Sequence, residues 1–146
     1  MQNLLSAVVV HHKDVKTTLE TIGSILASDY RRLRLIVVDC APRKDSVSLR
    51  ASESGAIVIR AFPDPGASSA RNIGIRRGMA DNPNYLLVFD SDIIFRRECL
   101  SKLVDRAMKS DDVGAVQPKV LSLQNPRKID TTGQDLTQDG AYDLGM

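Results

Sequence analysis

Cysteine and aromatic residues are scarce in this sequence. Its 146 residues include two cysteines, Cys40 and Cys99, no tryptophan, and only 4% aromatic residues. Two cysteines so far apart do not have the spacing of a zinc site, and they fit free thiols in a cytosolic protein better than a disulfide framework. The shortage of aromatic side chains also weakens any case for stacking on nucleic-acid bases.

A charge excess of one sign and long apolar runs are missing as well. Lysine and arginine total 20 against 18 acidic residues, so a formal net charge of +2 gives no reason to expect a nucleic acid as partner. No apolar run approaches the roughly twenty residues of a membrane helix, and the N-terminus has neither the basic nor the apolar region of a signal peptide. We therefore expect a cytoplasmic protein with no transmembrane segment in this chain.

What the sequence does contain is an alternation of apolar strands and amphipathic helices. Strands are predicted at 4–10, 34–38, 56–60, 85–89 and 113–117, and helices beginning near 14, 45, 68 and 98. Short strands or turns are expected after Pro118, at 119–123, 128–131 and 134–137. This order predicts the α/β class, with a mostly parallel Rossmann-like sheet and helices on both of its faces.

Three of these elements carry more specific expectations. The first helix is predicted to begin at the N-cap Asp14 and to bury one apolar face, formed by Val15, Leu19, Ile22 and Leu26. The strand 85–89 is continuously apolar, which is typical of a strand covered on both faces of a parallel sheet. The helix near residue 98 is expected to turn Leu100, Leu103, Val104 and Ala107 inward.

Acidic residues follow the apolar strand 85–89 directly. The segment Asp90-Ser91-Asp92 has the Asp-x-Asp spacing that places two carboxylates near one divalent cation, which prefers oxygen ligands and holds a diphosphate at the same time. A polar turn is the alternative for the same residues, because Asp and Ser favour turns.

Further polar groups fall at the carboxyl ends of other predicted strands. Asp39 ends the second strand, and Arg71-Asn72 lie on the first turns of the helix that follows a Gly-containing loop. Ligands of open α/β sheets bind at this edge, so the shared location favours a nucleotide diphosphate site over independent turns. Neither Gly-x-Gly-x-x-Gly nor a P-loop follows the first strand, which argues against a dinucleotide dehydrogenase and an ATPase.

Four short segments, in this order along the chain, carry a resemblance to a known family. They are Val8-Val9-Val10-His11-His12-Lys13, Ile36-Val37-Val38-Asp39-Cys40-Ala41-Pro42, Pro65-Gly66-Ala67-Ser68-Ser69-Ala70-Arg71-Asn72-Ile73-Gly74 and Leu87-Val88-Phe89-Asp90-Ser91-Asp92. Together they resemble the donor-binding half of a family 2 glycosyltransferase of the GT-A fold. The segment Ile129-Asp130-Thr131-Thr132-Gly133 is similar to a stretch of rhamnosyltransferase-like members.

The resemblance implies a metal-dependent, inverting transfer of a sugar from a nucleoside-diphosphate sugar, and it implies roles at matching positions. Asp39 would accept a hydrogen bond from the nucleobase imide, and His12 stands where an aromatic residue often stacks on the base. Arg71 would contact the nucleotide, and Asp90 the ribose or the metal shell. Asp92, with Asp90, would bind Mn²⁺ or Mg²⁺. The cation would neutralise charge on the leaving nucleoside diphosphate.

The chain also departs from the family pattern. His11-His12-Lys13 replaces the usual Thr-Tyr-Asn, and Cys40 replaces an acid or amide, so the nucleobase stays open; we expect a UDP- or dTDP-sugar. We expect a single domain, with residues 1–117 as the nucleotide-sugar-binding unit and 118–146 as the start of a truncated acceptor-side region.

The family's catalytic base and acceptor contacts lie in the second half of its members, and we expect the base beyond Met146. The acceptor would be a glycan, a lipid or a protein, and the full-length protein could act at the cytoplasmic face of the membrane. The isolated chain is expected to bind the donor without transferring its sugar.

Two other functions are alternatives to this one. A non-catalytic nucleotide-binding or interaction domain would keep the fold without the reaction, and turnover with an acceptor would exclude it. A sugar nucleotidyltransferase has a related fold, but such enzymes usually carry a Gly-rich loop where this chain has His11-His12-Lys13-Asp14.

Overall fold

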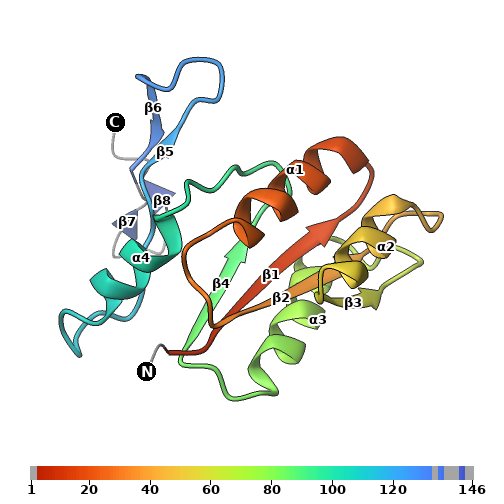
Figure 1. Ribbon diagram of the computed structural model, residues 1–146, viewed down its shortest axis with the longest axis horizontal. Helices are drawn as coiled ribbons and strands as arrows, with labels where there is room; N and C mark the ends of the chain where they lie inside the picture. Colours follow the sequence, from red (N-terminus) through yellow and green to blue (C-terminus); the bar gives the residue numbers. More distant parts are fainter. Residues whose placement is uncertain (1–2, 133–134, 137–141, 144–146) are drawn as a thin grey trace. The chain divides into compact units, whose positions relative to one another are not determined.

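The computed structural model describes residues 3–132, 135–136 and 142–143. The chain divides into two compact units, Met1–Glu98 and Cys99–Met146. The expectation of one domain with an internal boundary at residue 117 stays a prediction. The first unit alternates strands and helices (Figure 1) in the order β1 (Leu5–His11), α1 (Val15–Leu26), β2 (Leu33–Asp39), α2 (Ser46–Glu53), β3 (Ile57–Arg60), α3 (Ala67–Met79) and β4 (Tyr85–Phe89).

The strands of the first unit form one parallel four-stranded sheet in the order β3-β2-β1-β4. Leu5 at the start of β1 pairs with Leu33 on one side and with Tyr85 on the other. The chain therefore runs outward from β1 to β3 and then crosses back to place β4 on the free side of β1. The α/β class is confirmed, and the reversal between β1 and β4 is the topological switch point of the sheet.

Helix α3 packs closely on one face of the sheet. Its buried Ala70 joins a core cluster with Val8 and Val38 of the strands. A Cβ atom added at Gly74 would lie 2.3 Å from Cγ1 of Val8 and 3.0 Å from Cγ2 of Val38, so only glycine permits this approach. One turn later, the Ser6 hydroxyl donates to the carbonyl of Gly78 at 3.0 Å. These contacts fix where the N-terminal end of α3 lies at the carboxyl edge of the sheet.

Helices α1 and α2 cover the opposite face (Figure 1). Their N-caps are Asp14 and Asp45, each accepting a backbone N–H with its side chain, and Gly55 ends α2 with a φ of 85°. Asp14 as the N-cap of α1 is confirmed. The predicted buried face of α1 is wrong in part, because its fully buried residues are Thr18, Thr21, Ile22 and Ile25.

Hydrogen bonds from two threonine hydroxyls explain why the buried face of α1 differs from the predicted one. Thr18 donates to the Asp14 carbonyl at 2.7 Å, and Thr21 to the Ser91 carbonyl at 2.8 Å, so both threonines are buried with their polar atoms satisfied. Leu26, predicted to be buried, is 39% exposed. A pattern that counts only apolar side chains assigns such threonines to solvent.

Two strand predictions are corrected. β4 is an edge strand among the described residues, pairing with β1 alone, and Val88 is 39% exposed; the expected burial on both faces is therefore wrong. The segment 113–117 is not a strand, because Gly114 interrupts the short apolar run and no strand pairs with it in the described part of the chain.

The second unit begins with α4 (Cys99–Ala107); of the four residues predicted to face inward, Leu100 and Val104 are buried, and Leu103 and Ala107 are half-buried. Two antiparallel pairs follow, β5 (Val120–Leu121) with β6 (Ile129–Thr131) and β7 (Asp135–Leu136) with β8 (Tyr142–Asp143). Short strands after Pro118 are thus confirmed. Among the residues that the structure describes, no helix has the length and apolar character needed to cross a membrane.

Candidate functional site

A pocket of about 370 Å³ opens at the switch point of the sheet. The end of β1, the first turn of α1, the start of α3 and the loop after β4 each contribute to its wall. The lining residues are Val10, Asp14, Thr17, Ala67, Arg71, Asp90, Ser91 and Asp92. The pocket therefore lies where an open α/β sheet holds its ligands, outside the carboxyl ends of strands that diverge in connectivity.

Arg71 and Asp90 meet across this pocket. The Arg71 guanidinium donates from Nη2 to Oδ1 of Asp90 at 2.5 Å, and the two side chains are 43% and 65% exposed. The burial of the preceding residue, Ala70, against the sheet leaves Arg71 on the pocket side of α3. The pair is therefore open to solvent and to ligands, and it brings together two residues that the sequence pointed to.

Asp92 completes the predicted acidic pair. Its side chain is exposed, and in the described part of the chain it makes no hydrogen bond or ion pair. Among the residues that the structure describes, Asp92 thus has no partner to give up before it binds a ligand.

The pocket has a third carboxylate, Asp14, which the sequence analysis assigned only to helix capping. Its Oδ1 accepts the Thr17 N–H at 3.0 Å, and its Oδ2 accepts the Thr17 hydroxyl at 2.7 Å. The N–H and the hydroxyl of Thr17 hold the pKa of Asp14 below its ordinary value, so the group stays ionised at neutral pH. Its place in the loop after β1 was the available signal, because polar residues that follow the strands of a parallel sheet lie at the same edge as Asp39.

The charge of the pocket suits a cation that arrives with an anionic ligand. Asp14, Asp90 and Asp92 supply three carboxylates against the single guanidinium of Arg71. No group of three His, Cys, Asp or Glu side chains in the described residues is arranged to hold a metal ion. Mg²⁺ in proteins is commonly bound by one or two carboxylates together with substrate phosphates, so Asp90 and Asp92 fit this mode and not an all-protein cage.

Asp39 lies outside the pocket, on the α2 side of the sheet. Its side chain is fully buried: Oδ1 accepts the Ala41 N–H at 2.9 Å, and Oδ2 accepts both the Ser48 hydroxyl and Nη1 of Arg60, the latter at 2.9 Å. Protein donors occupy both carboxylate oxygens. The nucleobase contact expected of Asp39 stays a prediction.

His12 is also outside the pocket. Its Nε2 lies 2.8 Å from Oδ2 of Asp64, and its side chain is 46% exposed. Asp64 in turn accepts the N–H of Gly66, the residue before α3, at 2.9 Å. Through Asp64, His12 contacts the loop that leads into α3. Stacking of His12 on a nucleobase stays a prediction.

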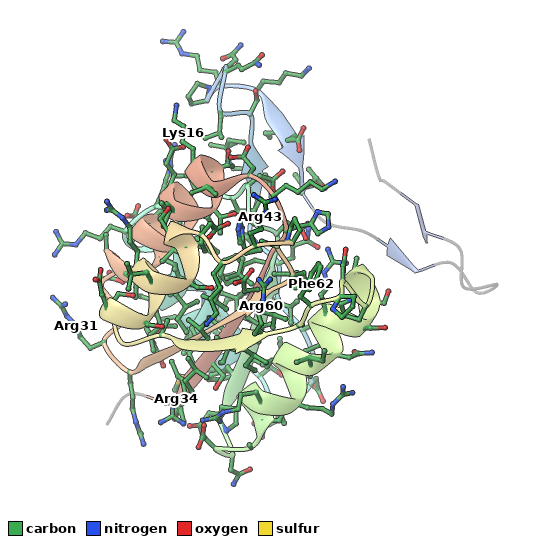
Figure 2. The ribbon with its side chains drawn as sticks, turned by 90° about the vertical axis from the view of Figure 1, so that its right-hand side faces the viewer. Lys16, Arg31, Arg34, Arg43, Arg60 and Phe62 are labelled. Atoms are coloured by element: carbon green, nitrogen blue, oxygen red, sulfur yellow. The ribbon has the colours of Figure 1, made fainter. Side chains whose placement is uncertain are left out.

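Sequence reasoning missed a pair beside Asp39. The Arg60 guanidinium carbon lies 5.3 Å from the ring centroid of Phe62, and the ring is 51% exposed (Figure 2). Arg60 ends β3 directly beside Asp39 in the sheet register, so its place at the carboxyl edge was a usable signal. A planar cation held by a buried carboxylate and stacked on an exposed ring makes a flat, polar surface at this edge.

Comparison with solved structures shows the same fold. A mannosyltransferase from Pyrobaculum calidifontis, in complex with GDP-Man and Mn²⁺, has a TM-score of 0.70 at 18% identity; the match covers 87% of this chain and 38% of that one. S. aureus TarS 1-349 in complex with UDP-GlcNAc has a TM-score of 0.60 at 20% identity, covering 85% of this chain and 42% of that one. The chain thus spans less than half of either protein.

The sequence was compared with curated proteins and with models of protein families. No curated protein sequence matches the chain. The family model described as glycosyl transferase family 2 matches residues 6–136, which include the parallel sheet except for its first residue, Leu5, and the whole pocket. This chain therefore belongs to glycosyl transferase family 2.

Proposed function

We propose that this chain is the donor-binding part of a glycosyltransferase, and that its pocket holds the diphosphate of a nucleoside-diphosphate sugar. The observation that carries the proposal is the convergence of Arg71, Asp90 and Asp92 in one pocket at the switch point. Family membership and the likeness to two transferase folds, one with GDP-Man and Mn²⁺ and one with UDP-GlcNAc, support it.

The phosphates of the donor are assigned to the α3 side of the pocket. Arg71 offers a guanidinium, whose planar donors match phosphate oxygens. The N-terminus of α3 begins at the pocket-lining Ala67 and has no side-chain cap, unlike α1 and α2, so its N–H groups add partial positive charge there. Donor binding would exchange the Arg71–Asp90 contact for an Arg71–phosphate contact.

Asp90 and Asp92 are the residues that would hold Mn²⁺ or Mg²⁺. When bound, the cation supplies charge neutralisation for the nucleoside diphosphate that leaves. Release of Asp90 from Arg71 would provide the second carboxylate, while Asp92 is available without such an exchange. We propose that transfer inverts the anomeric carbon and that the base for the acceptor hydroxyl is outside residues 1–146.

The nucleobase is assigned to the ends of β2 and β3, next to the pocket. Phe62 and His12 present exposed rings there, and Arg60 offers a guanidinium that Asp39 holds in place. If Asp39 accepts the base imide, it must exchange one of its protein donors, of which Ser48 is on the neighbouring helix. A UDP- or dTDP-sugar remains our proposed donor, with GDP as the first competitor to measure.

Calorimetric titration with UDP, dTDP and GDP in the presence of Mn²⁺, and then with EDTA, tests the proposal. We expect binding with Mn²⁺ and a loss of about tenfold to a hundredfold in affinity with EDTA or in Asp92→Ala, because a charge-assisted contact is removed. Glu53→Ala is the matched control, since Glu53 is an exposed carboxylate at the opposite end of α2 from its cap.

Two outcomes would contradict the proposal. If none of the three nucleotides binds with Mn²⁺, the pocket is not a donor site in this chain. If a nucleotide binds equally well with EDTA and in Asp92→Ala, the nucleotide site is independent of the acidic pair and of metal. Measured sugar transfer by a longer chain containing this unit would add the reaction to the binding function.

A further inference from the structure

A buried histidine lies at the carboxyl edge of the sheet, and the pocket does not use it. His11, the last residue of β1, is 0% exposed. Its Nε2 lies 2.8 Å from Oδ2 of Asp45, and its Nδ1 lies 3.0 Å from the hydroxyl oxygen of Thr18. One ring thus connects the end of β1 with the N-cap of α2 and the first turns of α1.

The hydrogen-bond count around Thr18 decides which partner donates at Nδ1. A threonine hydroxyl has one proton, and that of Thr18 is donated to the carbonyl of Asp14 at 2.7 Å. The Thr18 oxygen must therefore accept at His11, so Nδ1 of His11 carries a proton.

The second ring nitrogen faces a carboxylate. Oδ1 of Asp45 accepts the Val47 N–H at 2.9 Å, and Oδ2 is the atom that faces Nε2 of His11. Burial raises the pKa of Asp45, but the hydrogen bonds from His11 and Val47 outweigh it, and the net pKa is below the ordinary value. An ionised Asp45 only accepts, so Nε2 of His11 also carries a proton.

Other charged groups face the ring from the elements around it. Asp39 is its register partner on β2, and Arg60 acts on Asp45 by its charge. Asp14 contributes its backbone carbonyl through Thr18. Arg60 is paired with Asp39, so Asp45 is the carboxylate that contacts the ring itself.

We propose that His11 is held as an imidazolium and acts as a positioning residue: through Thr18 it fixes the Asp14–Thr17 wall of the pocket, and through Asp45 it ties α2 to the same edge. A ring that is neutral while Asp45 stays ionised keeps its one proton on Nε2 and leaves Nδ1 as an acceptor; the Thr18 hydroxyl then turns to Nδ1 and releases the Asp14 carbonyl. The charge state of His11 stands independently of ligand binding, whereas its effect on nucleotide affinity rests on the proposed function.

Nitrogen-15 NMR of the histidine-labelled chain measures the charge state directly. At neutral pH we expect both ring nitrogens of His11 to give the signals of protonated nitrogen. His12, half exposed, serves as the second histidine in the same spectrum. One protonated and one unprotonated nitrogen at His11, at a pH where Asp45 is ionised, would overturn the proposal.

Matched variants test whether the carboxylate of Asp45 sets the charge of His11. Asp45→Asn is expected to convert His11 to the neutral ring, while Asp64→Asn, the same change at the partner of His12, leaves the His11 signals unchanged. Unchanged, doubly protonated His11 signals in Asp45→Asn would show that Asp45 does not set the charge.

Nucleotide titration then tests the positioning role. Thr18→Val removes the hydroxyl and is expected to weaken binding several-fold, whereas Thr18→Ser restores it, because only the hydroxyl relays His11 to Asp14. Equal affinities of Thr18→Val and wild type would overturn the relay. Absence of nucleotide binding by the wild-type chain would instead count against the proposed function, and the NMR result would still decide the charge of His11.

Discussion

Gly74→Ala is expected to lower the free energy of unfolding by about 3 kcal/mol, the upper part of the usual range for overpacking a core. The added methyl would lie 2.3 Å from Cγ1 of Val8 and 3.0 Å from Cγ2 of Val38. Neither neighbour has room to yield, because both valines are fully buried in central strands and valine has few rotamers. Urea denaturation followed by far-UV circular dichroism measures the change as a shift in midpoint.

Gly23→Ala is the matched control for this substitution. Gly23 lies inside α1, and a Cβ atom added there would meet nothing within 4 Å. The same methyl should therefore raise stability by about 0.5 to 1 kcal/mol, since alanine loses less backbone entropy than glycine in a helix. Equal effects of the two variants would mean that Gly74 of α3 does not lie in close contact with Val8 and Val38.

The Gly74 variant also has a consequence for the pocket. Relief of the clash requires α3 to move away from β1 and β2, and Arg71 lies less than one turn before Gly74. Where the variant still folds, we expect it to bind nucleotide more weakly than wild type, while Gly23→Ala keeps the wild-type affinity.

Asp39→Asn is expected to cost about 3 kcal/mol, the lower end of the range for breaking a buried ion pair, because Arg60 remains 30% exposed. All three partners of the carboxylate are donors: the Ala41 N–H, the Ser48 hydroxyl and the Arg60 guanidinium. An asparagine amide presents one NH₂ group, which must face a donor in either orientation. The loss is measured by the same urea unfolding curves.

Asp64→Asn provides the comparison for Asp39→Asn. Asp64 also contacts a basic side chain, that of His12, and also accepts a backbone N–H, but its side chain is 38% exposed, so we expect a loss of no more than about 1 kcal/mol. A similarly small loss for Asp39→Asn, together with weakened nucleotide binding, would indicate that this carboxylate serves the ligand more than the fold.

Much of the architecture was predictable because each strand and helix has a strong local pattern. The parallel order of strands also predicted that Arg71, Asp90 and Asp92 meet, since the carboxyl ends of such strands share one edge. The exact neighbours of Asp39 were not predictable. The orientation of the Asp39 side chain depends on Ser48 and Arg60. These residues come from α2 and β3, and no local sequence pattern specifies how those elements pack beside β2.

Polar burial limited the sequence analysis in a second way. Thr18 and Thr21 are buried because the carbonyls of Asp14 and Ser91 accept hydrogen bonds from their hydroxyls. The acceptor of Thr21 lies 70 residues later in the chain, so no local pattern indicates it. The role of β4 as an edge strand depends on how many strands surround it, a property of topology that its own apolar residues do not encode.

The position of β4 beside β1 also sets an order of events during synthesis. β1 and β2 leave the ribosome early, but β4 is far later in the chain; the Leu4 N–H donates to Asn84 Oδ1 across 80 residues. Closing so long a loop is slow and comes after the local pairings. Residues Asp90 and Asp92 follow β4, so a nascent chain holds a partly built sheet with no pocket until its fourth strand docks.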